Sequence, residues 1–332
     1  MHPKFLDILA CPKTGEPLII EAKEYDNEGM VISGYLRNQS STYHYPIRNG
    51  IPRFVYSESY TDSFGYEWKK WSRVQFESEN IGGAMEGHTS RMFHRITELN
   101  ETDLIGKIIV EFGCGSGRFL DIVRKKGGIA VGIDMSEAAD IARTNFQDDS
   151  DVLIVQGDIL NPPFKKNVFD IGYTIGVLHH TPSPYDGLVS LSSCIKKGGV
   201  IACCVYSKNT FYDFRSVRIY RKILNFIKQL VGARVANFIA LYYAKFATYY
   251  LPRLFSRISN FPTISRFLKR NIFVYLELPD YRWNILDIFD AITPTYASTH
   301  TSEEVRKWFE DIGCSNIKAT NWGDTSYRGI KQ

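Results

Sequence analysis

Three glycines at two-residue spacing follow an apolar run that contains an acid. The run 108–112 is rich in β-branched residues and includes Glu111, and Gly113, Gly115 and Gly117 come directly after it. Glycine has no Cβ, so a strand that ends in such a turn lets the main chain come close to a ligand. The segment therefore predicts a strand whose end contributes to a small-molecule site.

A second acid stands where nucleotide-binding folds carry the group that holds ribose hydroxyls. The apolar segment 129–133 leads to Asp134, 21 residues after Gly113, which is the distance typical of that role. A third apolar segment, 152–155, leads to Asp158. Because the strand signals alternate with helical ones, we expect a parallel, doubly wound sheet with both acids at its carboxyl edge.

This succession of elements resembles the class I S-adenosylmethionine (SAM)-dependent methyltransferases. The resemblance continues through 169–170, 176–182 and 196–199 and covers roughly residues 106–207. It implies an α/β, Rossmann-like seven-stranded methyltransferase fold with S-adenosyl-L-methionine as cofactor. A dinucleotide-binding turn would read G-x-G-x-x-G, but the third glycine comes one residue earlier here, and SAM has no phosphate. NAD and FAD are therefore disfavoured.

The resemblance also implies roles for single residues. Glu111 would organise water or the methionine amino group, and Asp134 would accept hydrogen bonds from the ribose. Asp158 would accept from the adenine amino group, although an acid after a strand can also serve a turn. The cofactor-binding residues expected are Glu111, Gly113, Cys114, Gly115, Gly117, Asp134, Met135, Asp158, Ile159 and Gly176.

His179 and His180 are the candidates for catalysis. They follow the expected fourth strand, at the edge where such sheets meet ligands, and histidine is the natural base near neutral pH. Successive extended side chains point oppositely, so one of the two should face the reaction centre. Two alternatives stay open: both bond to neighbouring backbone, or the enzyme acts by positioning alone. Segments 285–287 and 293–296, with His300, resemble weaker active-site segments.

The segment 161–164, Asn-Pro-Pro-Phe, is similar to a motif of adenine amino-methyltransferases. In those enzymes the motif follows the fourth strand, whereas here the expected fourth strand, 168–173, comes later. The prolines should therefore lie away from the methyl group, which disfavours nucleobase amino methylation.

Composition is that of a soluble globular protein of 332 residues, 44% hydrophobic and 23% charged, with a net charge of +4. The six cysteines form no C-x-x-C pair, and no secretory signal is visible at the N-terminus. We therefore expect a cytoplasmic protein with reduced thiols.

The first 60 residues predict a separate module. Its two ends resemble a small zinc ribbon that also occurs as an activator of tRNA and rRNA methyltransferases. Such a ribbon holds zinc with cysteine pairs. The four positions that this spacing would assign to cysteine carry Cys11, Thr14, Asn38 and Ser41. One thiolate cannot complete a tetrahedral site, so we expect the ribbon's shape without a metal.

The rest of the chain divides in four. The expected parts are a helical cap at 61–105, the SAM-binding core at 106–207, a basic aromatic helical insertion at 208–279 and the end of the core at 280–332. In the cap, Tyr66 or Trp68 would either close over the cofactor or only attach the small module to the core, and we favour attachment.

The insertion is unusual in charge. Residues 208–272 hold 13 Lys and Arg against one acid, Asp213, a net charge of +12 that leaves −8 for the rest, and they hold 14 Phe and Tyr. Six apolar or aromatic residues recur at steps of three and four, as on one face of a helix: Phe214, Val217, Tyr220, Leu224, Ile227 and Val231. Three interpretations stay open: a lid over the acceptor pocket, an amphipathic contact with an anionic membrane surface and, least favoured, a nucleic-acid contact. The uncharged run 235–244 is too short to span a bilayer.

These patterns together predict a SAM-dependent methyltransferase. We expect the acceptor to be a hydroxyl, in preference to an amine, on a small molecule, a glycan or a lipid-linked compound. Two alternatives stay open: an RNA methyltransferase, suggested by the ribbon and the basic insertion, and a non-catalytic SAM-binding partner subunit.

Overall fold

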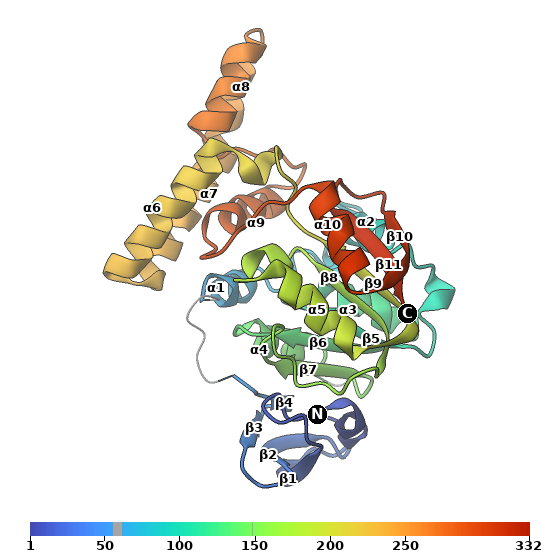
Figure 1. The fold of residues 1–332 in the computed structure, drawn as a ribbon. Helices are drawn as coiled ribbons and strands as arrows, with labels where there is room; N and C mark the ends of the chain where they lie inside the picture. Colours follow the sequence, from blue (N-terminus) through green and yellow to red (C-terminus); the bar gives the residue numbers. More distant parts are fainter. Residues whose placement is uncertain (56–61, 148) are drawn as a thin grey trace.

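A computed structural model describes residues 1–55, 62–147 and 149–332. Its centre is a seven-stranded sheet in the order β10-β11-β9-β8-β5-β6-β7, in which only the pairings of β11 are antiparallel (Figure 1). The strands are β5 (Ile108–Phe112), β6 (Ile129–Asp134), β7 (Val152–Gln156), β8 (Phe169–Ile175), β9 (Ile195–Cys204), β10 (Cys314–Ala319) and β11 (Ser326–Lys331). The expected Rossmann-like α/β fold is confirmed.

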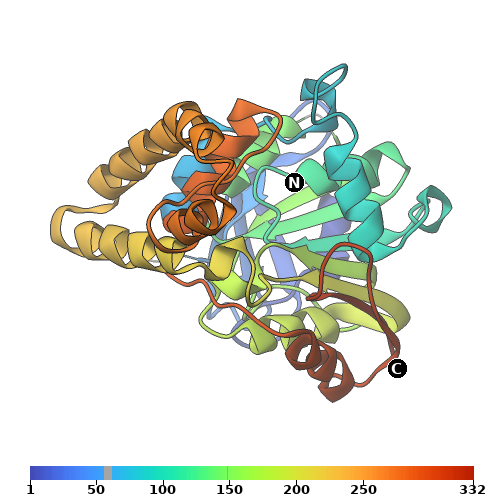
Figure 2. The same ribbon diagram turned by 90° about the horizontal axis from the view of Figure 1, so that it is seen from above.

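Both faces of this sheet are buried, which explains the nearly continuous apolar strands. Neighbours along β5 belong to different apolar clusters: Ile109 packs with Phe93 and Leu120, whereas Val110 packs with Leu188 and Phe309. The flanking helices are α2 (His88–Thr97), α3 (Arg118–Lys125), α4 (Ala138–Asn145), α5 (Pro184–Cys194) and α10 (Ser302–Asp311). They lie on both sides of the sheet (Figure 2).

The N-terminal residues form a small antiparallel sheet that continues the edge of the large one. Its strands are β1 (Leu18–Tyr25), β2 (Val31–Asn38), β3 (His44–Arg48) and β4 (Ile51–Pro52). Just after β4, the Phe54 amide donates to the Gln156 carbonyl on edge strand β7 at 2.8 Å, and Arg53 donates to Asp140 and Gln156. The module thereby covers an edge that would otherwise expose unpaired backbone groups.

The Asn-Pro-Pro-Phe segment serves this docking. Phe164 is buried and forms a bridge with Leu9, and the Pro163 carbonyl accepts the Ala10 amide at 3.0 Å. None of residues 161–164 lines the cavity described below. This placement agrees with the expectation that the prolines lie away from the methyl group.

The four positions of the ribbon pattern differ in environment. Cys11 is buried, with its sulfur 3.1 Å from the Tyr45 hydroxyl, and Asn38 is buried and donates to Glu16 at 2.6 Å, whereas Thr14 and Ser41 are exposed. In the parts of the chain that the structure describes, no group of three or more His, Cys, Asp or Glu residues could hold a metal ion.

The insertion consists of three helices that project from the body opposite the small module (Figure 1). They are α6 (Arg215–Val231), α7 (Ala233–Arg257) and α8 (Pro262–Asn271), and α1 (Asp62–Lys70) and α9 (Tyr281–Ile292) lie between them and the sheet. Of the residues expected on one helical face, Val217 and Leu224 are buried, whereas Val231 is exposed. None of the helices in the described ranges has the length and apolarity that a membrane span requires.

A single buried cation attaches the insertion to α9. Arg221 of α6 donates two hydrogen bonds to the Ala291 carbonyl, at 2.7 and 3.1 Å, and one to Ala297. Ala291 lies in the last turn of α9, where carbonyl groups lack helical partners and attract positive charge. Arg221 therefore fixes the C-terminal end of α9.

The metal-free ribbon stays a prediction. We expect the purified protein to contain no stoichiometric zinc and a chelator to leave its melting temperature unchanged, because one thiolate cannot hold the ion. Elemental analysis and thermal unfolding with and without EDTA measure both. About one zinc per chain would contradict the prediction and direct attention to His2 or His44 as replacement ligands.

Candidate cofactor and acceptor site

The carboxyl ends of the parallel strands open into one cavity of about 520 Å³. Of the residues expected to bind the cofactor or catalyse, all but Gly117 line it, together with α1 and α9. Those that line it are Glu111, Gly113, Cys114, Gly115, Asp134, Met135, Asp158, Ile159, Gly176, His179 and His180. Residues from the ends of four strands, β5 to β8, thus meet at one place, as the topology of such a sheet requires.

Asp134 is held by backbone at the end of β6. One carboxylate oxygen accepts the Gly115 amide at 2.9 Å, and the other accepts both the amide and the hydroxyl of Ser136. Burial raises the pKa of Asp134, and these hydrogen bonds act in the opposite direction. The oxygen that accepts the Gly115 amide has a second lone pair free, so the carboxylate is oriented for a ligand with a hydroxyl donor.

Glu111 is a second buried acid, 2% exposed, on β5. It accepts the Tyr173 hydroxyl at 3.2 Å, and burial raises its pKa well above the usual range. A buried carboxylate of this kind is stabilised by a positive ligand group, which suits an amino group or a sulfonium.

The glycine turn is required by packing as well as by ligand approach. Gly113 and Gly115 have φ values of 76° and 52°, in the left-handed region that favours glycine. A Cβ on Gly113 would lie 2.4 Å from Val177, and one on Gly115 would lie 2.8 Å from the Trp68 indole. Trp68 therefore lies against the turn and lines the cavity.

Tyr66 and Trp68 of α1, the two residues considered for closing over the cofactor, have different positions. Trp68 lines the cavity, but Tyr66 does not and stacks on Phe289 of α9 at 5.7 Å. Asp158 likewise combines the two roles considered for it: it accepts the Leu160 amide at 2.9 Å, as a turn residue does, and it also lines the cavity.

The two histidines are held as different tautomers. The Tyr206 amide donates to His179 Nδ1 at 3.2 Å, so the neutral ring of His179 carries its proton on Nε2. His180 Nδ1 lies 2.9 Å from the Tyr296 carbonyl, which can only accept, so His180 carries its proton on Nδ1 and has a free lone pair on Nε2. Only His180 can therefore accept a proton at Nε2.

Both Nε2 atoms are buried without a hydrogen-bond partner among the described residues, and the same is true of Glu67 Oε2 and Gln75 Oε1. All four residues line the cavity. Burial lowers the pKa of both histidines, and the Asp290 carboxylate partly offsets this for His180. Buried polar groups without partners are costly, which indicates that polar ligand atoms complete them.

One part of the cavity is rich in acids. Glu67 of α1 and Asp287 and Asp290 of α9 lie around Arg118. Burial raises the pKa of Asp287 to about 7, with a further increase from Asp290, while Arg118 lowers it. Burial, with the same two aspartates, also raises the pKa of Glu67 well above its usual range.

Aromatic rings form the wall of the cavity beside these acids. Tyr206 stacks between His179 and Tyr212, with both centroid distances 3.6 Å, and its hydroxyl donates to Asp290 at 2.7 Å. Trp283 of α9 and Trp322 also line the cavity.

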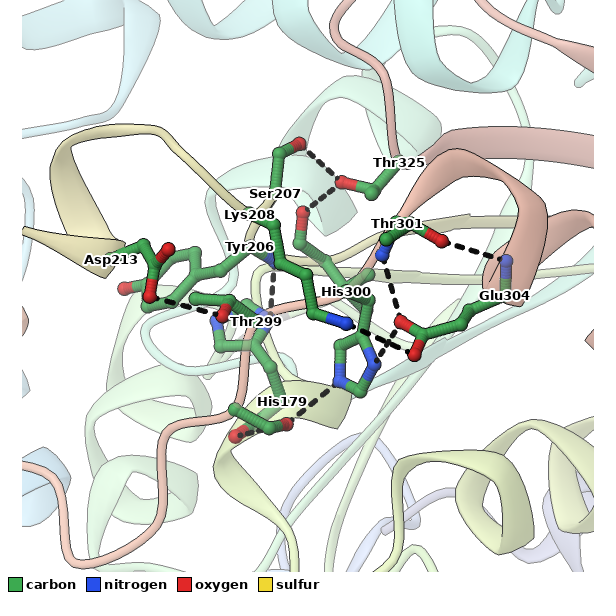
Figure 3. A network of polar contacts seen from close by, with 12 residues as sticks. His179, Tyr206, Ser207, Lys208, Asp213, Thr299, His300, Thr301, Glu304 and Thr325 are labelled. Carbon is green, nitrogen blue, oxygen red and sulfur yellow. Dashed lines mark hydrogen bonds and ion pairs between the residues drawn. The ribbon is translucent and has the colours of Figure 1, made fainter.

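A polar network behind His179 fixes the chain that leaves β9 (Figure 3). The His300 amide donates to the Tyr206 carbonyl at 2.9 Å, and the Lys208 side chain donates to Glu304 at 3.1 Å. Thr301 and Glu304 form the capping box of α10. His300 thus belongs to this support and does not line the cavity, whereas Leu286 and Asp287 do.

The sequence analysis missed Glu67, Arg118, Asp290, Tyr206 and Tyr212 as site residues. Asp287 and Asp290 carried a usable signal: two acids three residues apart in an otherwise apolar helix share one face. For Glu67 no local signal distinguishes a buried acid from a solvated one.

Comparison with known proteins indicates which kind of domain this is. Residues 110–203 match a family model described as a methyltransferase domain. The chain is 31% identical over 137 residues to a tRNA U34 carboxymethyltransferase of Colwellia psychrerythraea, covering 40% of this chain and 42% of the relative. It is 29% identical over 110 residues to a ubiquinone biosynthesis O-methyltransferase of Coxiella burnetii, covering 32% and 46%.

Among solved structures, a putative SAM-dependent methyltransferase of Methanococcus maripaludis aligns with a TM-score of 0.43 and 15% identity, covering 84% of this chain and 96% of that one. The chain spans less than half the length of the two curated relatives. With the fold and the strand-end site, the family match shows that the chain contains a SAM-dependent methyltransferase domain. The expected cofactor, SAM, and the expected enzyme class, methyltransferase, are confirmed for this domain.

The Asp134 assignment can be tested by binding. We expect Asp134→Ala to weaken SAM binding by roughly ten- to a hundred-fold, because hydrogen bonds to a charged acceptor, at ~1.5–3 kcal/mol each, are lost and partly replaced by water. Isothermal titration calorimetry measures this, with the exposed Asp186→Ala as control. Unchanged affinity in the Asp134 variant would remove the residue from the site.

The raised pKa of Asp287 predicts a pH-dependent stability. The folded protein binds this proton more tightly than the unfolded chain, so stability is lost as the pH rises from 3.8 towards about 7. Asp287→Asn should be roughly 1–3 kcal/mol more stable than the wild type at pH 8, and the two should converge near pH 4. Thermal unfolding at several pH values tests this against Asp311→Asn, a change outside the cavity. A pH-independent difference would contradict it.

Proposed function

We propose that the protein transfers a methyl group from SAM to a hydroxyl, in preference to an amine, of a small-molecule, glycan or lipid-linked acceptor. The observation that carries the proposal is His180 Nε2, a buried and unpartnered lone pair that lies in the cavity also lined by Asp134 and Glu111. A histidine in this tautomer can take the proton of a hydroxyl during methyl transfer.

The bound cofactor supplies a methyl group already activated by its sulfonium. With SAM bound as the methyl donor, His180 Nε2 would take the proton of the acceptor hydroxyl as that hydroxyl is methylated. Asp290 favours the imidazolium that results, since its charge raises the pKa of His180. His179 keeps its Nδ1 on the Tyr206 amide and acts as a fixed Nε2–H donor at the cavity wall.

The acid-rich part of the cavity supports a polyhydroxyl acceptor. Glu67, Asp287 and Asp290 provide carboxyl oxygens that accept hydroxyl protons, and Tyr212 and Trp283 provide apolar ring surface. Among the described residues that line the cavity, Arg118 is the one Lys or Arg.

RNA methylation is a second candidate. It is supported by the similarity to a tRNA U34 carboxymethyltransferase and by the basic insertion. It would require the RNA backbone to stay outside the acid-lined cavity. A third, a non-catalytic SAM-binding subunit, predicts SAM binding without turnover on any acceptor.

The histidine tautomers predict different effects for two substitutions. His180→Ala should lower turnover by ~10²–10⁴-fold with SAM binding retained, because the base is lost. His179→Asn should lower it less than about tenfold, since the Asn carbonyl can still accept the Tyr206 amide. Formation of S-adenosylhomocysteine is measured with glycosides and hydroxyquinones as acceptors.

The pH profile provides a second readout. Burial lowers the pKa of His180 from 6.5, so the base stays unprotonated below that value and activity should fall only at more acidic pH.

Equal losses of turnover in the His179 and His180 variants would contradict the tautomer assignment, and full activity in the His180 variant would leave positioning as the mechanism.

A further inference from the structure

The helices of the insertion expose most of the large apolar side chains on this molecule's surface. Of the 26 such residues exposed in the described structure, 17 lie between 219 and 272. On α6 they are Ile219, Ile223, Phe226, Leu230 and Val231, and on α7 they are Val235, Phe238, Ile239, Tyr242, Phe246, Tyr249, Tyr250 and Leu254. On and around α8 they are Phe261, Ile264, Phe267 and Ile272.

This exposed surface is distinct from the packed one. On α7 the buried positions include four alanines, Ala236, Ala240, Ala244 and Ala247, and the larger Leu241, Leu251 and Phe255, and α7 packs on α6 and α9. Eight further large side chains of α7 occupy outward positions, at helical spacing. The helix is therefore apolar on both faces, and a helix of this kind normally has a partner on each.

The acceptor cavity does not account for this surface. Thr210 and Tyr212 line the cavity, but none of the side chains described between 215 and 272 does. The lid is α9 instead, through Trp283, Leu286, Asp287 and Asp290. The helices α6 and α7 contact α9 and project from the body in both views (Figures 1 and 2).

Positive charge accompanies the apolar side chains. Exposed cations on the three helices include Arg215, Arg218, Lys222, Arg234, Lys245, Arg253, Arg257, Arg266 and Arg270. A shallow depression of about 260 Å³ on α6 is lined by Arg215, Arg218, Ile219 and Lys222. The segment 208–272 has a net charge of +12, whereas the remaining chain is negative.

We propose that the outer surface of α6, α7 and α8 binds peripherally to an anionic lipid bilayer. Exposed aromatic and aliphatic side chains enter the boundary between head groups and acyl chains, and the cations bind lipid phosphates. The charge argues against a second copy of this chain as the occupant, because two such surfaces would bring the exposed cations of one against those of the other. It matches anionic lipid, and aliphatic residues such as Leu230 and Ile264 suit hydrocarbon better than stacked bases.

Vesicle flotation of the full-length chain tests this. The probe is phosphatidylcholine vesicles with about 30 mol % phosphatidylglycerol, compared with pure phosphatidylcholine vesicles. We expect flotation with the anionic vesicles at low salt, weaker flotation in about 0.5 M salt and little with the neutral ones. Absence of binding to anionic vesicles at low salt overturns the proposal.

Matched variants distinguish binding through this surface from nonspecific binding through other exposed apolar side chains. The triple variant Phe226→Ser, Leu230→Ser, Phe238→Ser should lower the partition coefficient at least about tenfold, and Arg215→Gln with Lys222→Gln should lower it mainly at low salt. The control is Ile81→Ser with Ile105→Ser, which removes exposed apolar side chains 76% and 62% accessible elsewhere. Equal losses in variant and control overturn the proposal.

Two further readouts decide between occupants. Light scattering that shows a dimer dissociated by the triple variant, without vesicle binding, would assign the surface to self-association. Binding of single-stranded RNA without vesicle binding would assign it to nucleic acid. SAM titration of the same variants shows whether they are folded, and it is independent of the acceptor proposed above.

Discussion

The hydrogen bond from the Gly115 amide to the Asp134 carboxylate joins the ends of β5 and β6, and the site depends on it. It closes the glycine turn against the neighbouring strand and fixes the acid that faces the ligand. The left-handed backbone at Gly113 and Gly115 then leaves space for Val177 and Trp68 to pack on the turn. One local contact thus links sheet register, turn conformation and the wall of the cavity.

The histidine pair shows how backbone groups decide side-chain chemistry. His179 and His180 are adjacent, buried and 4.2 Å apart between ring centroids, yet one ring faces a backbone donor and the other a backbone acceptor. A neutral imidazole has one donor and one acceptor nitrogen, so these contacts give the two rings opposite proton positions at Nε2. Residue type alone could not have distinguished them.

The sequence predicted the acids at the strand ends better than the acids that come from α1 and α9. Asp134 and Asp158 follow strands, and the carboxyl ends of parallel strands share one edge, so a local pattern determines a three-dimensional position. Glu67 and Asp287 come from helices that are far apart in the chain and meet only through tertiary packing. The outward and inward apolar positions of α7 were likewise not separated, because helical spacing alone does not distinguish two apolar faces.

The contact between Arg221 and the end of α9 ties the roof of the cavity to the projecting helices. A guanidinium that leaves the Ala291 carbonyl loses hydrogen bonds of roughly 1.5–3 kcal/mol each and leaves a buried acceptor unpaired. Tilting α6 away from the body therefore carries the last turn of α9 with it or breaks these bonds. Asp290, one residue before Ala291, would move with that turn, so the hydrogen bond it accepts from Tyr206 depends mechanically on a helix that never enters the cavity.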